Sequence, residues 1–293
     1  MNWPQLSEAI AQVGGPQLHI ISAQPQSGGD IHQAWRLHTD QGDYFLKTNR
    51  PSSRPLFACE AHALEVIWET HTFRCPRPYA WGEGAGCAFL LLEYLPLGHG
   101  GNERDRGRAL ALLHHQLSPN GRFGWDEDNY IGHTLQPNGW SDDWIHFYGE
   151  KRLRHQLELA RAAGLSASTY EQGLTLIEAL PAFFSGYTPK PSLLHGDLWG
   201  GNSAFTEAGE PVIYDPASYY GDHEADLAMT ELFGGFGADF YAAYGELFAL
   251  DDGYRVRKTL YNLYHILNHF NLFGGGYGRS AQRMMQQLLA EVG

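Results

Sequence analysis

The stretch 193–216 constrains this chain more than any other part of its 293 residues. It contains the tripeptide His-Gly-Asp at 195–197, Asn202 five residues after Asp197, and Asp215 at the end of a short apolar run. A carboxylate at Asp197 can accept the proton of an attacking hydroxyl. Asn202 and Asp215 carry the oxygen ligands that magnesium prefers, and magnesium bridges the phosphates of ATP. The stretch therefore predicts a phosphoryl-transfer site.

The spacing resembles the catalytic loop of protein kinases, in which Asn follows the Asp of His-Arg-Asp by five residues and a metal-binding Asp comes later in Asp-Phe-Gly. Here Gly196 takes the place of the Arg, and Pro216 and Ala217 follow Asp215. These departures favour the small-molecule kinases of the same fold, of the aminoglycoside and choline kinase type. The alternative interpretation is a chance turn, since Gly and Asp are common turn residues.

Composition excludes several other classes of protein. Hydrophobic residues make up 43% of the chain and charged residues 18%, so it can bury a substantial core. The formal net charge of −13 disfavours nucleic acid or an anionic membrane as a partner, because both select clustered Lys and Arg. Three cysteines without a Cys-x-x-Cys spacing indicate reduced thiols. With no signal peptide or apolar membrane span evident, we expect a soluble, cytoplasmic protein.

The first third of the chain predicts a small antiparallel sheet with one main helix. The predicted strands are 18–22, 31–38, 43–48, 79–81 and 88–94; the predicted helices are 3–12 and 56–70. Gly28 and Gly29 separate the first two strands, where glycine lets backbone N–H groups approach a phosphate. An ordinary hairpin is the alternative for these two glycines.

Lys47 and Glu60 form a candidate pair within this region. Lys47 ends a mostly apolar strand, and Glu60 borders the apolar side of the helix that follows. In kinases such a lysine binds the α- and β-phosphates and is held by a glutamate of the next helix. The alternative is an edge-strand lysine.

The segment after the last predicted strand is expected to join two lobes. Glu93, Tyr94 and Leu95 would bind the adenine edge of ATP through their backbone. This gives an N-terminal lobe, 1–94, that binds the nucleotide phosphates. The C-terminal lobe, 95–293, would carry the catalytic loop and the metal and acceptor sites.

The rest of the chain predicts mainly helices. They are 104–115, 141–163 with Ser141 as a cap, 167–181, 222–233, 238–248, 254–273 and 280–292. The long loop 118–140 is expected to be ordered, because aromatic residues such as Trp125 and Trp140 are costly to leave in water. His265 and His269 have the spacing of metal ligands, but packing or hydrogen bonding is favoured over metal binding because no His-Glu-x-x-His motif is present.

Taken together, the chain resembles the fructosamine kinase (ketosamine-3-kinase) family nearly from end to end. The resemblance rests on the segments 27–31, 57–61, 123–125, 128–132, 136–140, 195–202, 215–217, 219–229, 267–269 and 272–277. Aminoglycoside kinases share the His-Gly-Asp motif and the metal ligands, but not the Trp-bearing loop. Many relatives have Arg in place of His223 and some have Cys near Asp30. The salt bridge of that Arg and redox control through that Cys are therefore not expected here.

The resemblance implies an α+β, two-lobed protein-kinase-like fold, with a small antiparallel N-terminal lobe and a larger, mainly helical C-terminal lobe. It implies ATP- and Mg²⁺-dependent phosphorylation of the 3-hydroxyl of a ketosamine, in deglycation. The acceptor would be a small-molecule or protein-bound fructosamine, ribulosamine or erythrulosamine. By the match, Asp197 is the base, Asn202 and Asp215 bind magnesium, and Lys47 and Glu60 bind phosphate.

Acceptor recognition is expected from aromatic residues. Trp199 can offer its indole to the C–H face of a sugar, and His195, Trp125 and Trp140 are further candidates. The alternative for Trp199 is a place in the core. An aminoglycoside- or choline-type phosphotransferase is the alternative function, and a pseudokinase is disfavoured because the catalytic and nucleotide-binding residues are all present. The sequence leaves open whether the protein is a monomer or a dimer.

Overall fold

The computed structural model describes residues 1–26 and 32–292, and its contacts divide the chain into two compact units. Unit 1 consists of Met1–Asn102 and Ser203–Pro216, and unit 2 of Glu103–Asn202 and Ala217–Gly293. This differs from the expected single boundary at 94/95. The N–H of Gly98 donates to the carbonyl of Phe205 at 2.8 Å, and this pairing joins the later segment to the first unit.

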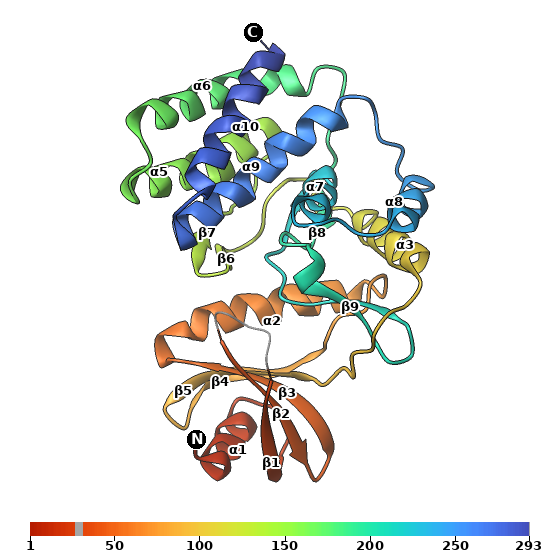
Figure 1. The fold of residues 1–293 in the computed structure, drawn as a ribbon. Coiled ribbons are helices and arrows are strands. Elements are labelled where there is room, and N and C mark those ends of the chain that lie inside the picture. Colours follow the sequence, from red (N-terminus) through yellow and green to blue (C-terminus); the bar gives the residue numbers. More distant parts are fainter. Residues whose placement is uncertain (27–31, 293) are drawn as a thin grey trace. The chain divides into compact units, whose positions relative to one another are not determined.

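Unit 1 is built on a five-stranded antiparallel sheet with the order β1-β2-β3-β5-β4 (Figure 1). The strands are β1 (Ile20–Gln26), β2 (Gln33–Thr39), β3 (Gly42–Asn49), β4 (Pro78–Gly84) and β5 (Cys87–Glu93). The helices α1 (Trp3–Gln12) and α2 (Arg54–Glu69) lie on opposite faces of this sheet. The small sheet with one main helix is thus confirmed, and Gly28 and Gly29 lie outside the described residues.

The alternation of side chains along β3 determines what each face of the sheet presents. Successive residues of a strand point to opposite faces. Leu46 belongs to an apolar cluster with Leu6 and Ile10 of α1, and all three are 0% exposed. Its neighbour Lys47 therefore points to the other face, toward Glu60 of α2.

A hairpin from the middle of the chain completes unit 1. It consists of β9 (Ser203–Phe205) and β10 (Pro211–Ile213), which pair antiparallel. The N–H of Ile213 donates to the carbonyl of Arg74 at 2.9 Å, in the segment between α2 and β4. Because β10 is anchored in this way, the residues that follow it, including Asp215, lie within unit 1.

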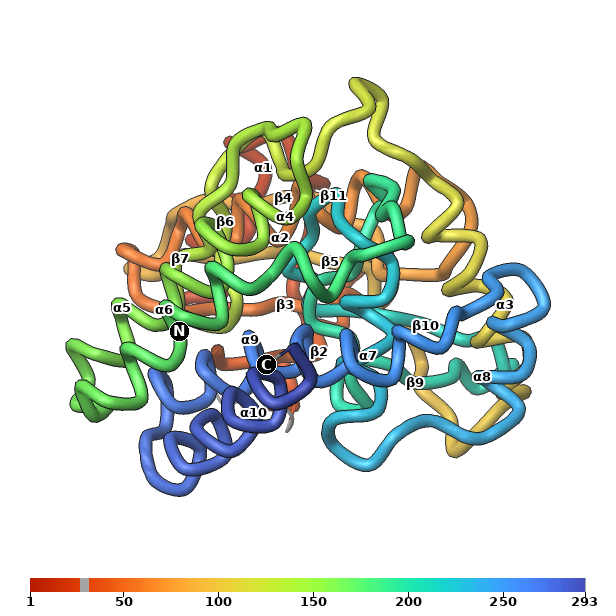
Figure 2. Tube along the Cα trace, turned by 90° about the horizontal axis from the view of Figure 1, so that it is seen from above, coloured from red at the N-terminus to blue at the C-terminus, as the bar shows by residue number. Residues whose placement is uncertain are grey.

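Unit 2 is mainly helical. Its helices are α3 (Glu103–His114), α4 (Trp144–Phe147), α5 (His155–Ala162), α6 (Ala167–Phe183), α7 (Glu224–Leu232), α8 (Ala238–Gly245), α9 (Tyr254–Phe273) and α10 (Tyr277–Val292), and its short strands are β6 (Asn129–Ile131), β7 (Thr134–Gln136), β8 (Ser192–Leu194) and β11 (Tyr219–Gly221). Helix α9 contributes many buried side chains and packs against α5, α7 and α10 (Figure 2). Within the described residues, no helix is long and apolar enough to cross a membrane.

The predicted helix 141–163 is the main local difference from expectation. Its cap is Asp143, whose Oδ1 accepts from the N–H groups of Ile145 at 2.8 Å and His146 at 3.2 Å. Ser141 instead donates its hydroxyl to the carbonyl of Asp143. The helical segment also contains a π-helical stretch, Tyr148–Arg154, between α4 and α5.

The loop 118–140 is ordered, as its aromatic content predicts. Gln136 donates to Asn129 Oδ1 at 2.8 Å and to the carbonyl of Ala217 at 3.0 Å, and all of these atoms are buried. The hydroxyl of Tyr264 in α9 donates to the side-chain oxygen Oε1 of Gln136 at 2.6 Å. Buried amide groups require such partners, so this network fixes the loop against α9 and the start of β11.

Candidate active site

Lys47 is the centre of an ion-pair network in unit 1. Its Nζ lies 2.6 Å from Glu60 Oε1 and also donates to Asp215 Oδ1. The side chains of Lys47 and Glu60 are 8% and 11% exposed. Burial alone would lower the pKa of Lys47, but the carboxylates of Asp215 and Glu60 outweigh it and raise that pKa. The lysine is therefore cationic at neutral pH and suited to binding an anionic group.

The backbone of Asp215 adopts an unusual conformation. Its φ of 59° lies in the left-handed region, which non-glycine residues adopt rarely and at an energetic cost. Such strain persists where the surrounding structure requires it, and it is concentrated at functional sites. From this conformation the Asp215 carboxylate reaches Lys47.

The catalytic loop of unit 2 requires glycine at the position that distinguishes it from protein kinases. Gly196 has a φ of 86°, and a Cβ built on it would lie 2.0 Å from the carbonyl oxygen of Ala217. The N–H of Ala217 donates to the carbonyl of His195 at 2.8 Å, which holds the two segments together. An arginine at 196 could not fit against this backbone.

Asp226 of α7 binds the backbone of the catalytic loop. Its carboxylate accepts from the N–H of His195 at 2.6 Å and that of Gly196 at 2.8 Å, and His114 Nε2 lies 3.2 Å away. Burial alone would raise the pKa of Asp226, but its contacts with His114, His195 and Gly196 hold that pKa below its usual range. The sequence gives no role to Asp226, although it stands in the segment 219–229 that marks the family.

Replacing Asp226 with Asn should destabilise unit 2, because an amide cannot accept from both loop N–H groups and His114. Hydrogen bonds to a charged group are worth about 1.5–3 kcal/mol each, so we expect a loss of about 2–3 kcal/mol in urea unfolding at neutral pH. The pKa of Asp226 is lower in the folded protein than in the unfolded chain. The ionised carboxylate therefore stabilises the fold above about pH 4, and this contribution is lost as the pH falls through the folded-state pKa. Asp226→Asn should therefore lack this loss of stability at low pH, whereas Asp239→Asn, a change at an exposed carboxylate, should retain it.

Asn202 lies beside the proposed base. Its Nδ2 donates to the backbone carbonyl of Asp197 at 2.9 Å and to Asp197 Oδ2 at 3.2 Å. Both bonds use the amide nitrogen, so its oxygen Oδ1 can serve as a ligand. An amide oxygen and a carboxylate are the donor types that magnesium takes from a protein when phosphates supply other ligands. The side chains of Asn202 and Asp215 thus fit magnesium chemically.

The candidate acceptor residues differ in exposure. Trp199 is 39% exposed and meets Phe233 edge to face at 6.0 Å, so it is not a core residue. A Cβ at Gly201 would lie 2.2 Å from the Trp199 ring, which explains the glycine there. His195 is 0% exposed, and its Nδ1 accepts from the N–H of Asp197, so a direct acceptor contact is not supported for it.

Trp125 and Trp140 both pack near Tyr220, at ring distances of 5.5 Å and 6.1 Å. Trp125 is only 3% exposed, so a sugar could not stack on it without displacing its neighbours. Trp140 is half-buried and keeps part of its ring accessible. Of this pair, Trp140 is the one that can still contact an acceptor.

The segment predicted to bind adenine follows β5. The N–H of Glu93 donates to the carbonyl of Arg77 at 2.8 Å, and its carboxylate pairs with Arg74 at 2.5 Å. Tyr94 lies under the guanidinium of Arg36, 4.4 Å from the ring centroid, and Leu95 is half-buried. The adenine contacts of Glu93, Tyr94 and Leu95 remain predictions, and the N–H and carboxylate of Glu93 already have partners within unit 1.

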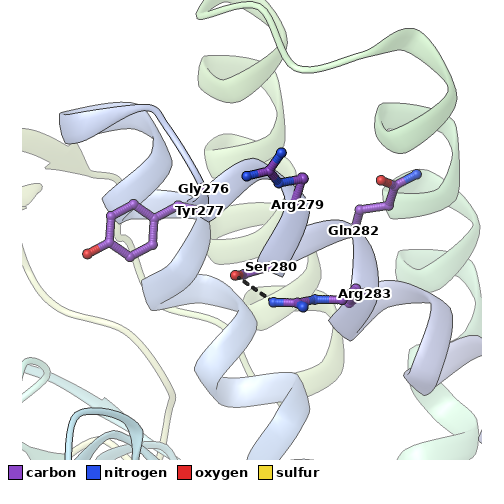
Figure 3. Close-up of a pocket in the computed structure, with 6 residues that line it drawn as sticks. All are labelled: Gly276, Tyr277, Arg279, Ser280, Gln282 and Arg283. Atoms are coloured by element: carbon purple, nitrogen blue, oxygen red, sulfur yellow. Dashed lines mark hydrogen bonds between the residues drawn. The ribbon is translucent and has the colours of Figure 1, made fainter.

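A surface hollow lies at the start of α10. It is lined by Gly276, Tyr277, Arg279, Ser280, Gln282 and Arg283 (Figure 3). Arg283 reaches back to the hydroxyl of Ser280 at 3.3 Å, and the ring of Tyr277 points away from the two arginines. None of these residues belongs to the catalytic loop or to the Lys47 network, so the hollow is not the predicted active site.

Comparison with known proteins shows the family to which the chain belongs. The family model for fructosamine kinase matches residues 2–291. A Synechocystis protein named "Probable ketoamine kinase" is 45% identical over 98% of this chain and 97% of its own. A chloroplastic protein-ribulosamine 3-kinase of Arabidopsis thaliana is 45% identical over 94% of this chain and 85% of its own.

Solved structures extend the comparison to the fold. A crystal structure assigned to a fructosamine-3-kinase of Haemophilus somnus has a TM-score of 0.88 at 30% identity, covering 98% of this chain and 97% of that one. The choline kinase LicA of Streptococcus pneumoniae has a TM-score of 0.64 at 14% identity, covering 98% of each chain, and so shares the fold alone. The expected α+β, protein-kinase-like fold is confirmed. The chain belongs to the fructosamine kinase family.

Proposed function

We propose that this protein is an ATP-dependent ketosamine 3-kinase, which transfers the γ-phosphoryl group of ATP to the 3-hydroxyl of an Amadori product. The observation that carries the proposal is the catalytic loop, in which Asp197 is fixed through Asp226 and Asn202 while Trp199, two residues on, remains exposed. Membership of the fructosamine kinase family and the names of the relatives support the ketosamine as acceptor.

Each residue of the proposed site would have a separate role in the reaction. Asp197 accepts the proton of the attacking hydroxyl, and Asn202 holds the Asp197 carboxylate in place. Lys47, oriented by Glu60, binds the α- and β-phosphates. Asn202 and Asp215 would hold magnesium, which would supply positive charge to neutralise the charge that develops on the phosphates. Gly28 and Gly29 would cover the phosphates, and the backbone of Glu93, Tyr94 and Leu95 would bind adenine.

The sequence of the chain links the two groups of residues. The chain leaves unit 2 directly after Asn202 and returns to it directly after Pro216. Both proposed magnesium ligands are close to these crossings in the sequence: Asn202 is the last residue before the first, and Asp215 precedes Pro216 at the second.

A panel of acceptors tests the proposal. The protein should consume ATP with fructosamine, ribulosamine or erythrulosamine, and the loss of the amine from the unstable 3-phosphate should follow. An aminoglycoside and choline, given at the same concentration, should not be phosphorylated. Turnover of either of these, without turnover of any ketosamine, would assign the chain to the alternative class of phosphotransferase.

Replacing Trp199 with Ala should weaken acceptor recognition and leave ATP binding nearly unchanged. The indole can stack on the C–H face of a sugar and orient its 3-hydroxyl. Loss of one such aromatic contact should reduce kcat/KM for a ketosamine by about 5–150-fold, equivalent to about 1–3 kcal/mol. Tyr79→Ala, which removes a ring of similar exposure from β4, should leave kcat/KM unchanged. An active, stable Trp199→Ala enzyme would place acceptor recognition elsewhere.

A further inference from the structure

A buried histidine has one ring nitrogen close to the proposed base. His265 lies on α9, and its side chain is 6% exposed. Its Nδ1 has no hydrogen-bond partner in the part of the chain that the structure describes. The carboxylate oxygen Asp197 Oδ1 lies 3.9 Å from Nδ1. Buried polar atoms are almost always paired, so an unpaired one beside a catalytic carboxylate requires an explanation.

The separation of these two atoms indicates what is missing. A distance of 3.9 Å is too long for a hydrogen bond between Nδ1 and Oδ1. An oxygen atom placed about 2.8 Å from each would make two normal hydrogen bonds. A hydroxyl oxygen can do this, because it donates one proton and accepts through its lone pairs.

The protonation state of His265 fits a neutral partner. Burial, with the neighbouring His269, lowers the pKa of His265 to about 3. The ring is therefore neutral at physiological pH and carries a single N–H. It does not form an ion pair with Asp197, and its contribution to the site is that of a hydrogen-bonding group.

The ring of His265 packs against an anchored neighbour. The ring of Tyr264 meets the His265 ring edge to face at 5.2 Å, and the Tyr264 hydroxyl is anchored on Gln136 at 2.6 Å. A fixed donor of this kind can orient a reacting group without reorganisation during the reaction.

We propose that His265 is a further catalytic residue, which binds the hydroxyl that is phosphorylated. Its Nδ1–H donates to the oxygen of that hydroxyl, while the hydroxyl donates its own proton to Asp197 Oδ1. In the transfer the oxygen forms a bond to the γ-phosphorus, the bond between that phosphorus and the leaving ADP oxygen breaks, and Asp197 takes the proton. The inference rests on the proposed function and adds a second contact to the reacting oxygen.

The first test compares two substitutions at this position. His265→Leu removes the donor, and we expect kcat/KM for a fructosamine to fall by about 10²-fold, the loss typical of one preorganised donor at a reacting oxygen. His265→Asn can present an amide N–H near the position of Nδ1, and it should recover a large part of that loss. Neither change should alter the affinity for ATP.

The control variant is Asn271→Ala, which removes a structural hydrogen bond from the same helix, between Asn271 and Gln156 at 2.6 Å. It should lower the melting temperature and leave kcat/KM unchanged. If His265→Leu and His265→Asn lose the same amount of kcat/KM, or if neither loses more than Asn271→Ala, His265 is only structural and the proposal is overturned.

A binding measurement separates a contact to the reacting hydroxyl from a bound water. The ligands are a fructosamine and its 3-deoxy analogue, titrated in the presence of a non-hydrolysable ATP analogue. The wild-type protein and Asn271→Ala should prefer the ligand with the hydroxyl, and His265→Leu should lose this preference by weakening only that ligand. A preference unchanged in His265→Leu would place a water at Nδ1 and overturn the proposal. If the wild-type protein phosphorylates no ketosamine, the proposed function itself fails.

Discussion

Replacing Asp197 with Asn should reduce kcat by about 10²–10⁴-fold while the protein still folds and binds ATP with magnesium. The amide cannot accept the proton of the acceptor hydroxyl. Its oxygen can still accept the hydrogen bond that Asn202 donates to Asp197 Oδ2, so the local structure of the loop should persist. The loss should therefore appear in the chemical step rather than in the stability of the protein.

Rapid-quench measurement of a single turnover, together with ATP titration, would test this prediction. The control is Asp142→Asn, which makes the same change in a carboxylate that is 83% exposed and paired with Arg122. It should behave as wild type in both measurements. A kcat for Asp197→Asn within tenfold of the wild-type value would show that another group accepts the proton.

Removing the carboxylate of Asp215 should have its largest effect on nucleotide binding in the presence of magnesium. Even residues that only support metal ligands contribute about 10–100-fold to metal affinity, so loss of a ligand should weaken the binding of ATP with magnesium by at least about 100-fold. Asp215→Ala should also leave Lys47 paired with Glu60 alone, which keeps the lysine charged.

Calorimetric titration of ATP over a range of magnesium concentrations distinguishes a metal ligand from a general electrostatic effect. Wild-type affinity should rise with magnesium, and that of Asp215→Ala should hardly change. The control is Asp43→Ala, which removes a carboxylate paired with Arg36 in the same unit and should leave the magnesium dependence intact. A variant of Asp215 with the wild-type magnesium dependence would remove this residue from the metal site.

Local sequence patterns could predict the parts of the site that depend on one element or on neighbouring elements. Alternation along β3 places Lys47 opposite the apolar face, and its partner Glu60 comes from the next helix. Asn202 follows Asp197 by five residues in the same loop, so the contact between their side chains depends on local chain geometry alone. The strained φ of Asp215 has no such signal, because Asp tolerates many conformations and nothing in its neighbours requires this one.

Contacts between distant parts of the chain could not be predicted in this way. Asp226 reaches His195 across 31 positions, and this pairing depends on how α7 packs beneath the loop. His265 lies on a helix whose pattern indicates only a buried face, so its proximity to Asp197 emerges from tertiary packing. The segment 203–216 likewise joins the first unit through short strands. Strands this short show little periodicity in the sequence, so their pairing could not be predicted.

The identity of the phosphorylated atom is the most direct test of the central claim. The wild-type protein, ATP, magnesium and a fructosamine labelled with ¹³C at C3 should be followed by ³¹P and ¹³C NMR as the reaction proceeds. We predict a phosphorus signal coupled to the labelled carbon, equal in amount to the ADP formed, followed by its decay as free amine appears. A phosphorus coupled to another carbon, or ADP formed with no phosphorylated ketosamine, would contradict the assignment of this chain as a ketosamine 3-kinase.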